Sequence, residues 1–217
     1  MKTATDLWDA IASGDLKQVQ DLVAEDSTLA GARNPKGVSA VMTAMYHRRP
    51  DIAGALAAAG APLDLMELIA LGLIDAVAGA LEEDGALNVK SPDGFYPTHY
   101  AAFFGRAEIM KLLLEHGADA QVVADNPMKV QPLHSAVAVR CMECVRLLLA
   151  AGVSVNARQE GGWTALQAAA KHGDIEMIDV LLQHGADPNQ QADSGLSAID
   201  LAGAEGHLEA VARLRSP

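Results

Sequence analysis

The chain has 217 residues, half of them apolar, and carries 28 Asp and Glu against 16 Lys and Arg, a formal net charge of −12. A charge of this sign repels phosphate backbones, which disfavours nucleic acid as the main partner and favours a basic protein. The first ten residues lack the apolar run of a secretory signal, and no stretch of about 18 apolar residues is free of charge. We therefore expect no membrane span and a cytoplasmic protein.

Aromatic residues make up only 4% of the chain, whereas Ala and Leu are abundant, which favours helices that pack closely on small side chains. Two segments, Leu7–Gly14 and Leu65–Gly72, begin a helix pair without a preceding turn of the Gly-x-Thr type. We interpret them as an internal duplication. The first is expected to cap the start of the chain, and the second to interrupt the row of turns near Pro62–Glu67.

Three short stretches share one pattern at a spacing of roughly 33 to 35 residues. They are Tyr96-Pro97-Thr98-His99, Gln131-Pro132-Leu133-His134 and Thr164-Ala165-Leu166-Gln167. Proline in the first turn of a helix costs little, because its missing N–H would be unpaired there. The stretches therefore predict short first helices, each followed by a Leu-rich second helix that ends at Gly117, Gly152 or Gly185.

These residues resemble the ankyrin repeat, as found in bacterial-type ankyrin-repeat domain proteins. The best matches are Pro132–Ala136 followed by Leu147–Asn156, and Trp163–Ala170 followed by Gly185–Asn189. The resemblance covers most of the chain and implies an all-α solenoid of stacked helix-turn-helix units with short β-hairpin fingers. It also implies a monomeric, non-enzymatic protein that binds another protein and holds no cofactor.

The pattern predicts a single ankyrin-repeat domain over residues 1–217. A finger is expected in most of its repeats but not in the third. The predicted parts are an N-terminal cap repeat (1–34), a repeat (35–64), a repeat without a finger (65–90), three further repeats (91–124, 125–157 and 158–191) and a C-terminal cap repeat (192–217).

Cys141 and Cys144 form a Cys-x-x-Cys motif. Such a pair can bind zinc or cycle between dithiol and disulfide, and either would give the chain a chemical function. Zinc needs two further ligands and the chain has no second Cys pair, so we expect a buried, apolar Cys144 and no metal. His99 and His134 recur at one repeat position, as a structural role requires, and are expected to bond to the backbone of the turns. Because no phosphate loop, zinc-protease helix or nucleophile elbow is present, we predict no catalytic residues.

The resemblance also implies where a partner binds. It places the residue between Gly and Thr at the tip of each finger, and the two residues before the next Gly on the concave face. Most of the few aromatic residues fall on these positions, and an apolar strip exposed to water marks an interaction site. An alternative is that Phe103 and Phe104 cover the core of the neighbouring repeat. The predicted binding residues are Tyr46, His47, Phe95, Phe103, Phe104, Val130, Val139, Trp163, Lys171 and His172.

The predicted function is that of an interaction module, an adaptor, regulator or inhibitor that holds a protein partner in its concave groove and on its fingertips. Two alternatives stay open. One is an acidic, immunity-type inhibitor of a basic toxin, which rests on fold analogy alone. The other is a redox or metal-linked regulator that uses Cys141 and Cys144.

Overall fold

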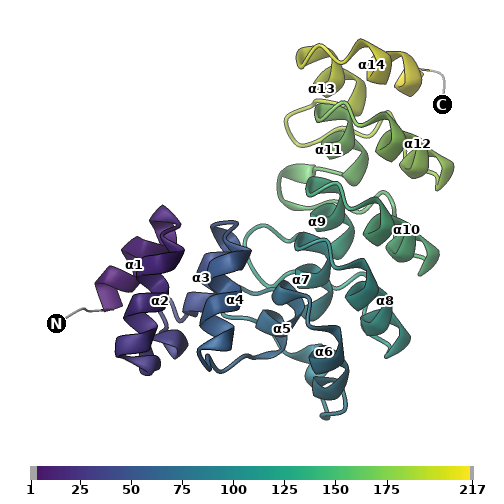
Figure 1. Cartoon of the computed structure of the whole chain (residues 1–217). Helices are drawn as coiled ribbons and strands as arrows, with labels where there is room; N and C mark the ends of the chain where they lie inside the picture. The colour runs from purple at the N-terminus through teal and green to yellow at the C-terminus, as the bar shows by residue number, and fades with distance from the viewer. Residues whose placement is uncertain (1–3, 216–217) are drawn as a thin grey trace. The chain divides into compact units, whose positions relative to one another are not determined.

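The computed structural model describes residues 4–215, which form fourteen α-helices in seven successive pairs (Figure 1). The predicted all-α class is confirmed. The pairs are α1 (Ala4–Ser13) with α2 (Leu16–Glu25), α3 (Ala40–Tyr46) with α4 (Pro50–Ala58), α5 (Leu65–Leu71) with α6 (Ile74–Ala80), α7 (Pro97–Phe103) with α8 (Ala107–Glu115), α9 (Pro132–Ala138) with α10 (Met142–Ala150), α11 (Ala165–Lys171) with α12 (Ile175–Gln183), and α13 (Ala198–Ala204) with α14 (Leu208–Arg215).

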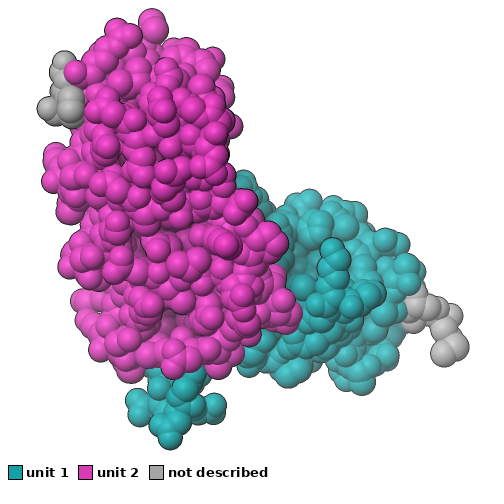
Figure 2. Space-filling view, turned by 180° about the vertical axis from the view of Figure 1, so that it is seen from behind, with its two compact units in different colours: residues 1–86 teal, residues 87–217 magenta. Residues whose placement is uncertain are grey.

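The chain divides into two compact units, residues 1–86 and residues 87–217, coloured separately in Figure 2. Unit 1 contains the helix pairs from α1 to α6, and unit 2 contains those from α7 to α14. Each predicted repeat contains one helix pair as far as residues 4–215 extend, and the last two residues of the C-terminal cap lie outside the described part. The single domain over the whole chain stays a prediction.

Unit 2 is built around its short first helices. α7, α9, α11 and α13 lie side by side in chain order, and each packs against the next. Small buried side chains such as Ala101, Ala136 and Ala169 allow this close approach. Leu113 and Leu148 from the second helices fill the space behind them and are fully buried. Replacing a buried Leu of this kind by Ala typically costs about 2 to 5 kcal/mol of stability.

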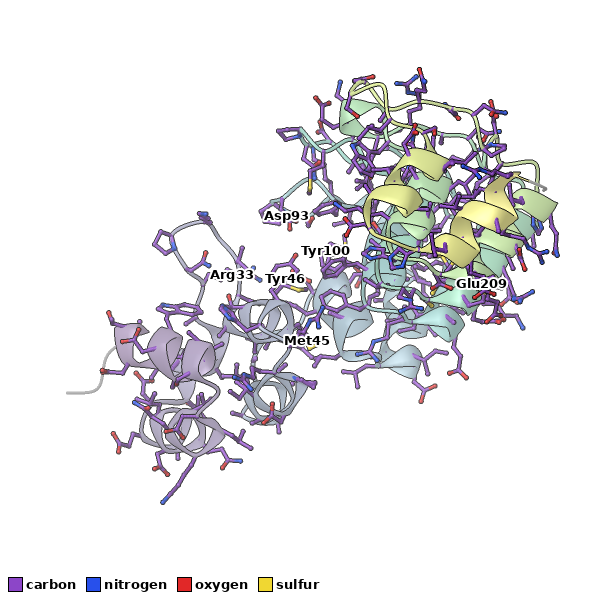
Figure 3. All side chains as sticks on the ribbon, turned by 90° about the horizontal axis from the view of Figure 1, so that it is seen from above. Arg33, Met45, Tyr46, Asp93, Tyr100 and Glu209 are labelled. Carbon is purple, nitrogen blue, oxygen red and sulfur yellow. The ribbon has the colours of Figure 1, made fainter. Side chains whose placement is uncertain are left out.

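The fingers are tight turns and not strand ladders. In the described residues the only β-type pairing is an isolated antiparallel bridge between Arg33 and Ser39. The finger before α7 is closed by two backbone bonds, from the Ser91 N–H to the Phe95 carbonyl and from the Gly94 N–H to the Ser91 carbonyl, both 2.9 Å. The Tyr100 hydroxyl also donates to Asp93 Oδ1 at 3.1 Å and anchors this turn to α7 (Figure 3).

His99 connects α7 to the finger of the following repeat. Its Nδ1 accepts the Tyr96 N–H at 3.3 Å, and its Nε2 donates to the Val130 carbonyl at 3.0 Å. His134 Nδ1 likewise accepts the Gln131 N–H at 3.1 Å, and its Nε2 donates to the Ala157 carbonyl at 3.0 Å, just before the finger that the bond from the Gln159 N–H to the Trp163 carbonyl closes. The expected structural role of both histidines is confirmed. Burial lowers the pKa of both imidazoles, because the charged form would lose water.

In the next repeat, the side-chain amide of Gln167 also accepts one backbone N–H and donates to backbone carbonyls. Its Oε1 accepts the Thr164 N–H at 2.9 Å. Its Nε2 donates forward to the carbonyls of Gln190 and Leu196 at 2.9 and 3.0 Å. This repeat position therefore requires a side chain of this length that has one hydrogen-bond acceptor and one donor. Both an imidazole and an amide meet this requirement.

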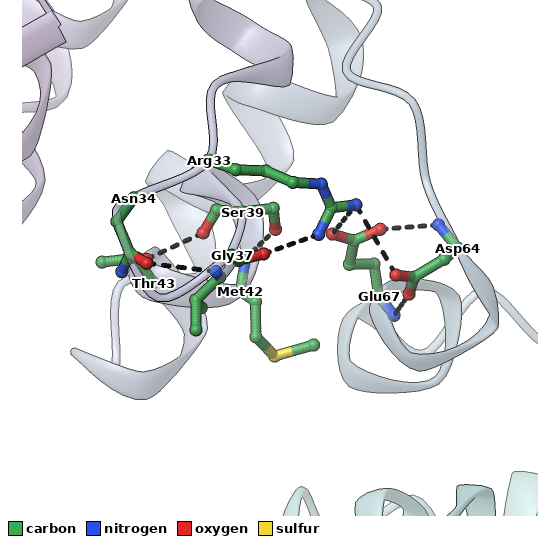
Figure 4. Close-up of polar contacts among 9 residues, drawn as sticks. Arg33, Asn34, Gly37, Ser39, Met42, Thr43, Asp64 and Glu67 are labelled. Atoms are coloured by element: carbon green, nitrogen blue, oxygen red, sulfur yellow. Dashed lines mark hydrogen bonds and ion pairs between the residues drawn. The ribbon is translucent and has the colours of Figure 1, made fainter. Parts of the chain in front are cut away.

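In unit 1, α5 has a carboxylate at this position. Glu67 is 1% exposed and its Oε2 accepts the Asp64 N–H at 2.6 Å (Figure 4). The Arg33 guanidinium lies 3.8 Å from Glu67 Oε1 and donates to the Gly37 carbonyl at 3.0 Å. An ionised carboxylate has no proton to donate, so Glu67 binds a cation from the preceding finger instead. Burial raises the pKa of Glu67, although a Ser39 bond opposes the shift.

Replacing His134 by Gln tests the donor–acceptor requirement. We expect the fold to survive at neutral pH within about 1 kcal/mol, because Gln167 shows that an amide satisfies both partners. The folded-state pKa of His134 is lowered, so wild-type stability falls as pH drops below about 6.5. The variant should lose less stability than wild type between pH 7.5 and pH 5 in urea unfolding. Equal acid sensitivity of the two proteins would contradict the assignment.

Glu67→Gln tests the cost of the buried carboxylate. A raised folded-state pKa means that the charged form reduces stability at pH 7, a loss that is absent below the unfolded pKa of about 4.3. We expect the amide to stabilise the protein by about 1 kcal/mol or less at pH 7, with no gain near pH 4. The check is thermal unfolding at both pH values. A less stable variant at pH 7 would show that the Arg33 ion pair outweighs the burial.

Candidate protein-binding surface

The ends of the first helices in unit 2 form a row of residues that we call the inner row. α7, α9, α11 and α13 each contribute their last residue and the residue that follows. Because these helices pack side by side, the row runs from one repeat to the next. Its members are Phe103, Phe104, Ala138, Val139, Lys171, His172, Ala204 and Glu205.

Two apolar side chains of the inner row are open to solvent. Phe103 is 47% exposed and Val139 is 38% exposed. Phe103 directly follows the buried Ala102, and Val139 follows the buried Val137 by two residues, with the exposed Ala138 between them. Exposure therefore begins at the last residue of each helix, Phe103 in α7 and Ala138 in α9.

Other predicted aromatic residues pack partly on their own repeat. Phe104 is half-buried, with its ring centroid 6.0 Å from that of Tyr100 and 5.1 Å from that of Phe103. Phe95, at a fingertip, is also half-buried and lies 5.5 Å from the His99 ring. These two side chains therefore help to hold α7 and its finger, whereas the alternative was that Phe103 and Phe104 cover the core of the neighbouring repeat. Phe103 offers the more accessible ring.

Trp163 and Lys171 meet, although they were predicted separately as a fingertip and an inner-row residue. The Lys171 ammonium lies 5.7 Å from the centroid of the Trp163 ring, within the range of a cation–π interaction. The indole also lies over Gly161, where a Cβ atom would sit 3.2 Å from Trp163 Cδ1. Gly161 has a φ of 73°, so both the close approach and the backbone favour glycine there.

The remaining predicted residues are placed as follows. Val130 is half-buried at its fingertip, and its carbonyl accepts the His99 bond. His172 is exposed beside Lys171. Tyr46, 40% exposed, and His47 stand at the end of α3 in unit 1 and are described with that unit. Whether any of these residues binds a partner stays a proposal.

Arg140 is a residue that the sequence analysis missed. It follows Val139 with a left-handed φ of 59°, at the turn where the neighbouring repeats have Gly105 and Gly173, both at φ 64°. A left-handed conformation costs a residue with a side chain roughly 1 to 2 kcal/mol, which glycine avoids. Its Nε donates to Asp174 Oδ2 at 2.7 Å. An Arg where other repeats have Gly was the signal in the sequence.

Comparison with known proteins agrees with this geometry. Residues 65–159 and 153–216 match the family model of ankyrin repeats in three copies, which is more than half of the chain. The chain belongs to the ankyrin-repeat family. Ankyrin repeats are in general protein–protein interaction modules without enzymatic activity of their own. Among residues 4–215 no helix is long and apolar enough to cross a membrane.

Individual relatives match the chain over only part of their length. Ankyrin repeat domain-containing protein 13B of Mus musculus is 34% identical over 89 residues, 41% of this chain and 14% of the relative. The Nuclear factor NF-kappa-B p105 subunit of Gallus gallus is 31% identical over 105 residues, 48% and 11%. The B-cell lymphoma 3 protein homolog of Mus musculus is 32% identical over 142 residues, 65% and 27%. The chain therefore spans a minor part of each relative.

The two cysteines have structural roles in this ankyrin-repeat fold. Cys141 is the N-cap of α10, and its Sγ accepts the Cys144 N–H at 3.3 Å. Cys144 is fully buried, as predicted, and burial raises the pKa of its thiol. A protonated, buried thiol is a poor nucleophile. In the part of the chain that the structure describes, no three His, Cys, Asp or Glu side chains gather in a group that could hold a metal.

Substitution of the cysteines tests these roles. Cys141→Ser replaces the capping sulfur by a hydroxyl oxygen that can accept the same N–H, so stability should change by less than about 0.5 kcal/mol. Cys144→Ala should cost about 1 kcal/mol through lost packing, and Cys144→Ser should cost more because it buries a hydroxyl. Partner binding should be unchanged in all three variants. Urea unfolding and metal analysis are the measurements, and stoichiometric zinc that disappears in a Cys141→Ser/Cys144→Ala protein would contradict the assignment.

Proposed function

We propose that the chain binds a protein partner through the inner row and fingertips of unit 2. The observation that supports this most is the exposure of Phe103 and Val139 on consecutive repeats, beside the Trp163–Lys171 pair. Aromatic side chains carry much of the energy of protein interfaces, because they bury a large rigid area at little entropic cost. Tyr46 and His47 of unit 1 are proposed as further contacts.

The chain would act as an adaptor or inhibitor in the cytoplasm and not as a catalyst. The general role of ankyrin repeats as non-enzymatic interaction modules supports this proposal. The inhibitor of a basic toxin rests on fold analogy, with which the net charge of −12 is compatible. A dithiol or metal-linked regulator is less favoured, because the buried Cys144 thiol is held protonated by its raised pKa. No specific contact among the described residues supports either alternative.

Alanine substitutions separate binding from folding. Phe103→Ala and Trp163→Ala should each weaken partner binding by about 2 kcal/mol, roughly thirtyfold. Because Phe103 is exposed, its replacement by Ala should change the free energy of unfolding by less than about 0.5 kcal/mol. Leu208→Ala is the matched control, because Leu208 is 79% exposed and lies at the start of α14, outside the inner row.

The assay compares the proteins that each variant captures from a cell extract, together with its melting temperature. We expect the captured set to be lost with Phe103→Ala and Trp163→Ala and retained with Leu208→Ala. If both inner variants melt normally and capture the full set, the proposed surface is wrong. A Phe103→Ala protein that melts several degrees lower would show that this ring belongs to the core.

A further inference from the structure

One finger of unit 2 is longer than the other three that the structure describes. A bond from the Ala124 N–H to the Val130 carbonyl at 2.8 Å closes it, so that it spans seven residues, 124–130. We call it the long finger. Equivalent bonds close the others over five residues each, at 91–95, 159–163 and 192–196. The helices on either side, α8 and α9, have nine and seven residues, as α12 and α11 do, so the extra residues belong to the finger alone.

The long finger is bonded to the finger that precedes it. The Asp125 N–H donates to the Gly94 carbonyl at 2.8 Å, and Asn126 Nδ2 donates to the Asp93 carbonyl at 2.9 Å. Lys90 also forms an ion pair with Asp125. The approach at Gly94 excludes a larger residue, because a Cβ atom there would lie 2.3 Å from the Asp125 carbonyl oxygen and its φ is 85°. The two fingers are therefore held together.

Met128 lies where the backbone of the long finger is fixed on both sides. Its N–H donates to Asn126 Oδ1 at 3.0 Å, and its carbonyl accepts the Glu160 N–H of the following finger at 3.0 Å. Pro127 before it has a φ restricted by its ring. Lys129 after it has a left-handed φ of 47°, which costs energy in a residue with a side chain and persists only where the surrounding structure imposes it. The backbone of Met128 is thus ordered before any partner binds.

The Met128 side chain is nevertheless open to solvent. It is 51% exposed, whereas the fingertip residues Phe95, Val130 and Trp163 are half-buried. A single exposed apolar side chain is ordinary on a protein surface. An insertion that only added length would be expected to lie loosely there, as surface loops commonly do. The unusual feature is the combination of a large apolar side chain with a backbone that is bonded to both neighbouring fingers and strained at the next residue.

Charge does not select the partner at the long finger. The charged side chains of adjacent fingers are bonded within the chain, as Lys90 to Asp125, Arg158 to Asp193, and Asp93 to the Tyr100 hydroxyl. Lys129, next to Met128, and Glu160, bonded to its carbonyl, have opposite signs. The side chain that distinguishes this fingertip is therefore an apolar one.

We propose that Met128 is an anchor that inserts into an apolar pocket on a folded protein partner. A side chain in a turn can be surrounded only by a concave surface, whereas an extended peptide would cover one side of it and bury less area. Methionine suits this role because its unbranched, flexible side chain adapts to the shape of a pocket. The ordered backbone lowers the entropic cost of association. This inference rests on the proposed function, to which it adds a contact residue and the kind of partner.

The test selects binders of the full-length chain from two displayed libraries, one of small folded domains with randomised concave surfaces and one of random linear peptides. The tightest binders should be folded domains. For the best domain, Met128→Ala should raise Kd about tenfold or more, and Met128→Leu, which keeps the apolar volume, less than about threefold. Val123→Ala is the matched control, because Val123 is 47% exposed and immediately precedes the long finger. The control should change Kd by less than about twofold, and all three variants should melt as wild type.

Asn126→Ala tests the ordered backbone, because it removes the bonds to the Asp93 carbonyl and the Met128 N–H but leaves Met128 in place. Kd for the same domain should rise about fivefold without a change in melting temperature. In hydrogen exchange, the Asp125 and Glu160 amides of the wild type should be protected, since both donate to neighbouring fingers, and the variant should lose protection. Wild-type affinity in Asn126→Ala, or unprotected amides in the wild type, overturns the inference.

The remaining outcomes distinguish the inference from the proposed function. Domains that keep their affinity for Met128→Ala but lose it for Phe103→Ala or Trp163→Ala overturn the inference and leave the proposed function standing. Linear peptides that bind as tightly and depend on Met128 overturn the pocket, and so does equal weakening by Met128→Ala and Val123→Ala. Dependence on Met128 but on neither Phe103 nor Trp163 supports the inference and removes the inner row from the binding surface. Binders that depend on none of the three residues, or no binders at all, overturn both.

Discussion

In three of the four first helices of unit 2, one side chain near the helix start both accepts and donates a hydrogen bond, and the packing of successive repeats depends on it. The acceptor closes the first turn of its own helix, and the donor satisfies a carbonyl in or just before the following finger. Buried polar groups left unpaired cost about 1 to 3 kcal/mol each. His99, His134 and Gln167 meet this requirement in turn. The His99 bond holds the fingertip backbone of Val130 against α7, and a Gln167 bond holds that of Leu196 against α11.

The forward bond stops where the side chain cannot donate. Glu67 in α5 and Asp200 in α13 close their own helix starts but are carboxylates, and their helix pairs are the last of unit 1 and of unit 2 in the described residues. Glu67 receives Arg33 from the preceding finger instead. A His or Gln at this position therefore carries a proton for a second carbonyl, whereas an ionised Glu or Asp does not.

Features that depend on the position of a residue within its repeat could be predicted from the sequence. Features that depend on the direction in which a side chain points could not. The roles of His99 and His134 and the burial of Cys144 follow from repeat position, because each repeat places that position in the same surroundings. The contact between Trp163 and Lys171 depends on two side chains turning toward one another, which register does not specify. Phe104 differs from Phe103 for the same reason, since its ring turns back onto Tyr100.

A first helix of two turns leaves little of itself exposed. In α7 the six residues from Pro97 to Ala102 are buried, and only the last, Phe103, is open to solvent. Each repeat therefore offers about one helix-end residue and the turn that follows it to a partner, and a binding surface is assembled from single residues of successive repeats. With so few positions, one charge has a large share in specificity. At Arg140 the helix end has a further constraint, because a left-handed φ of 59° is one that glycine adopts without strain, and the bond from Arg140 Nε to Asp174 Oδ2 at 2.7 Å is the contact that offsets this cost.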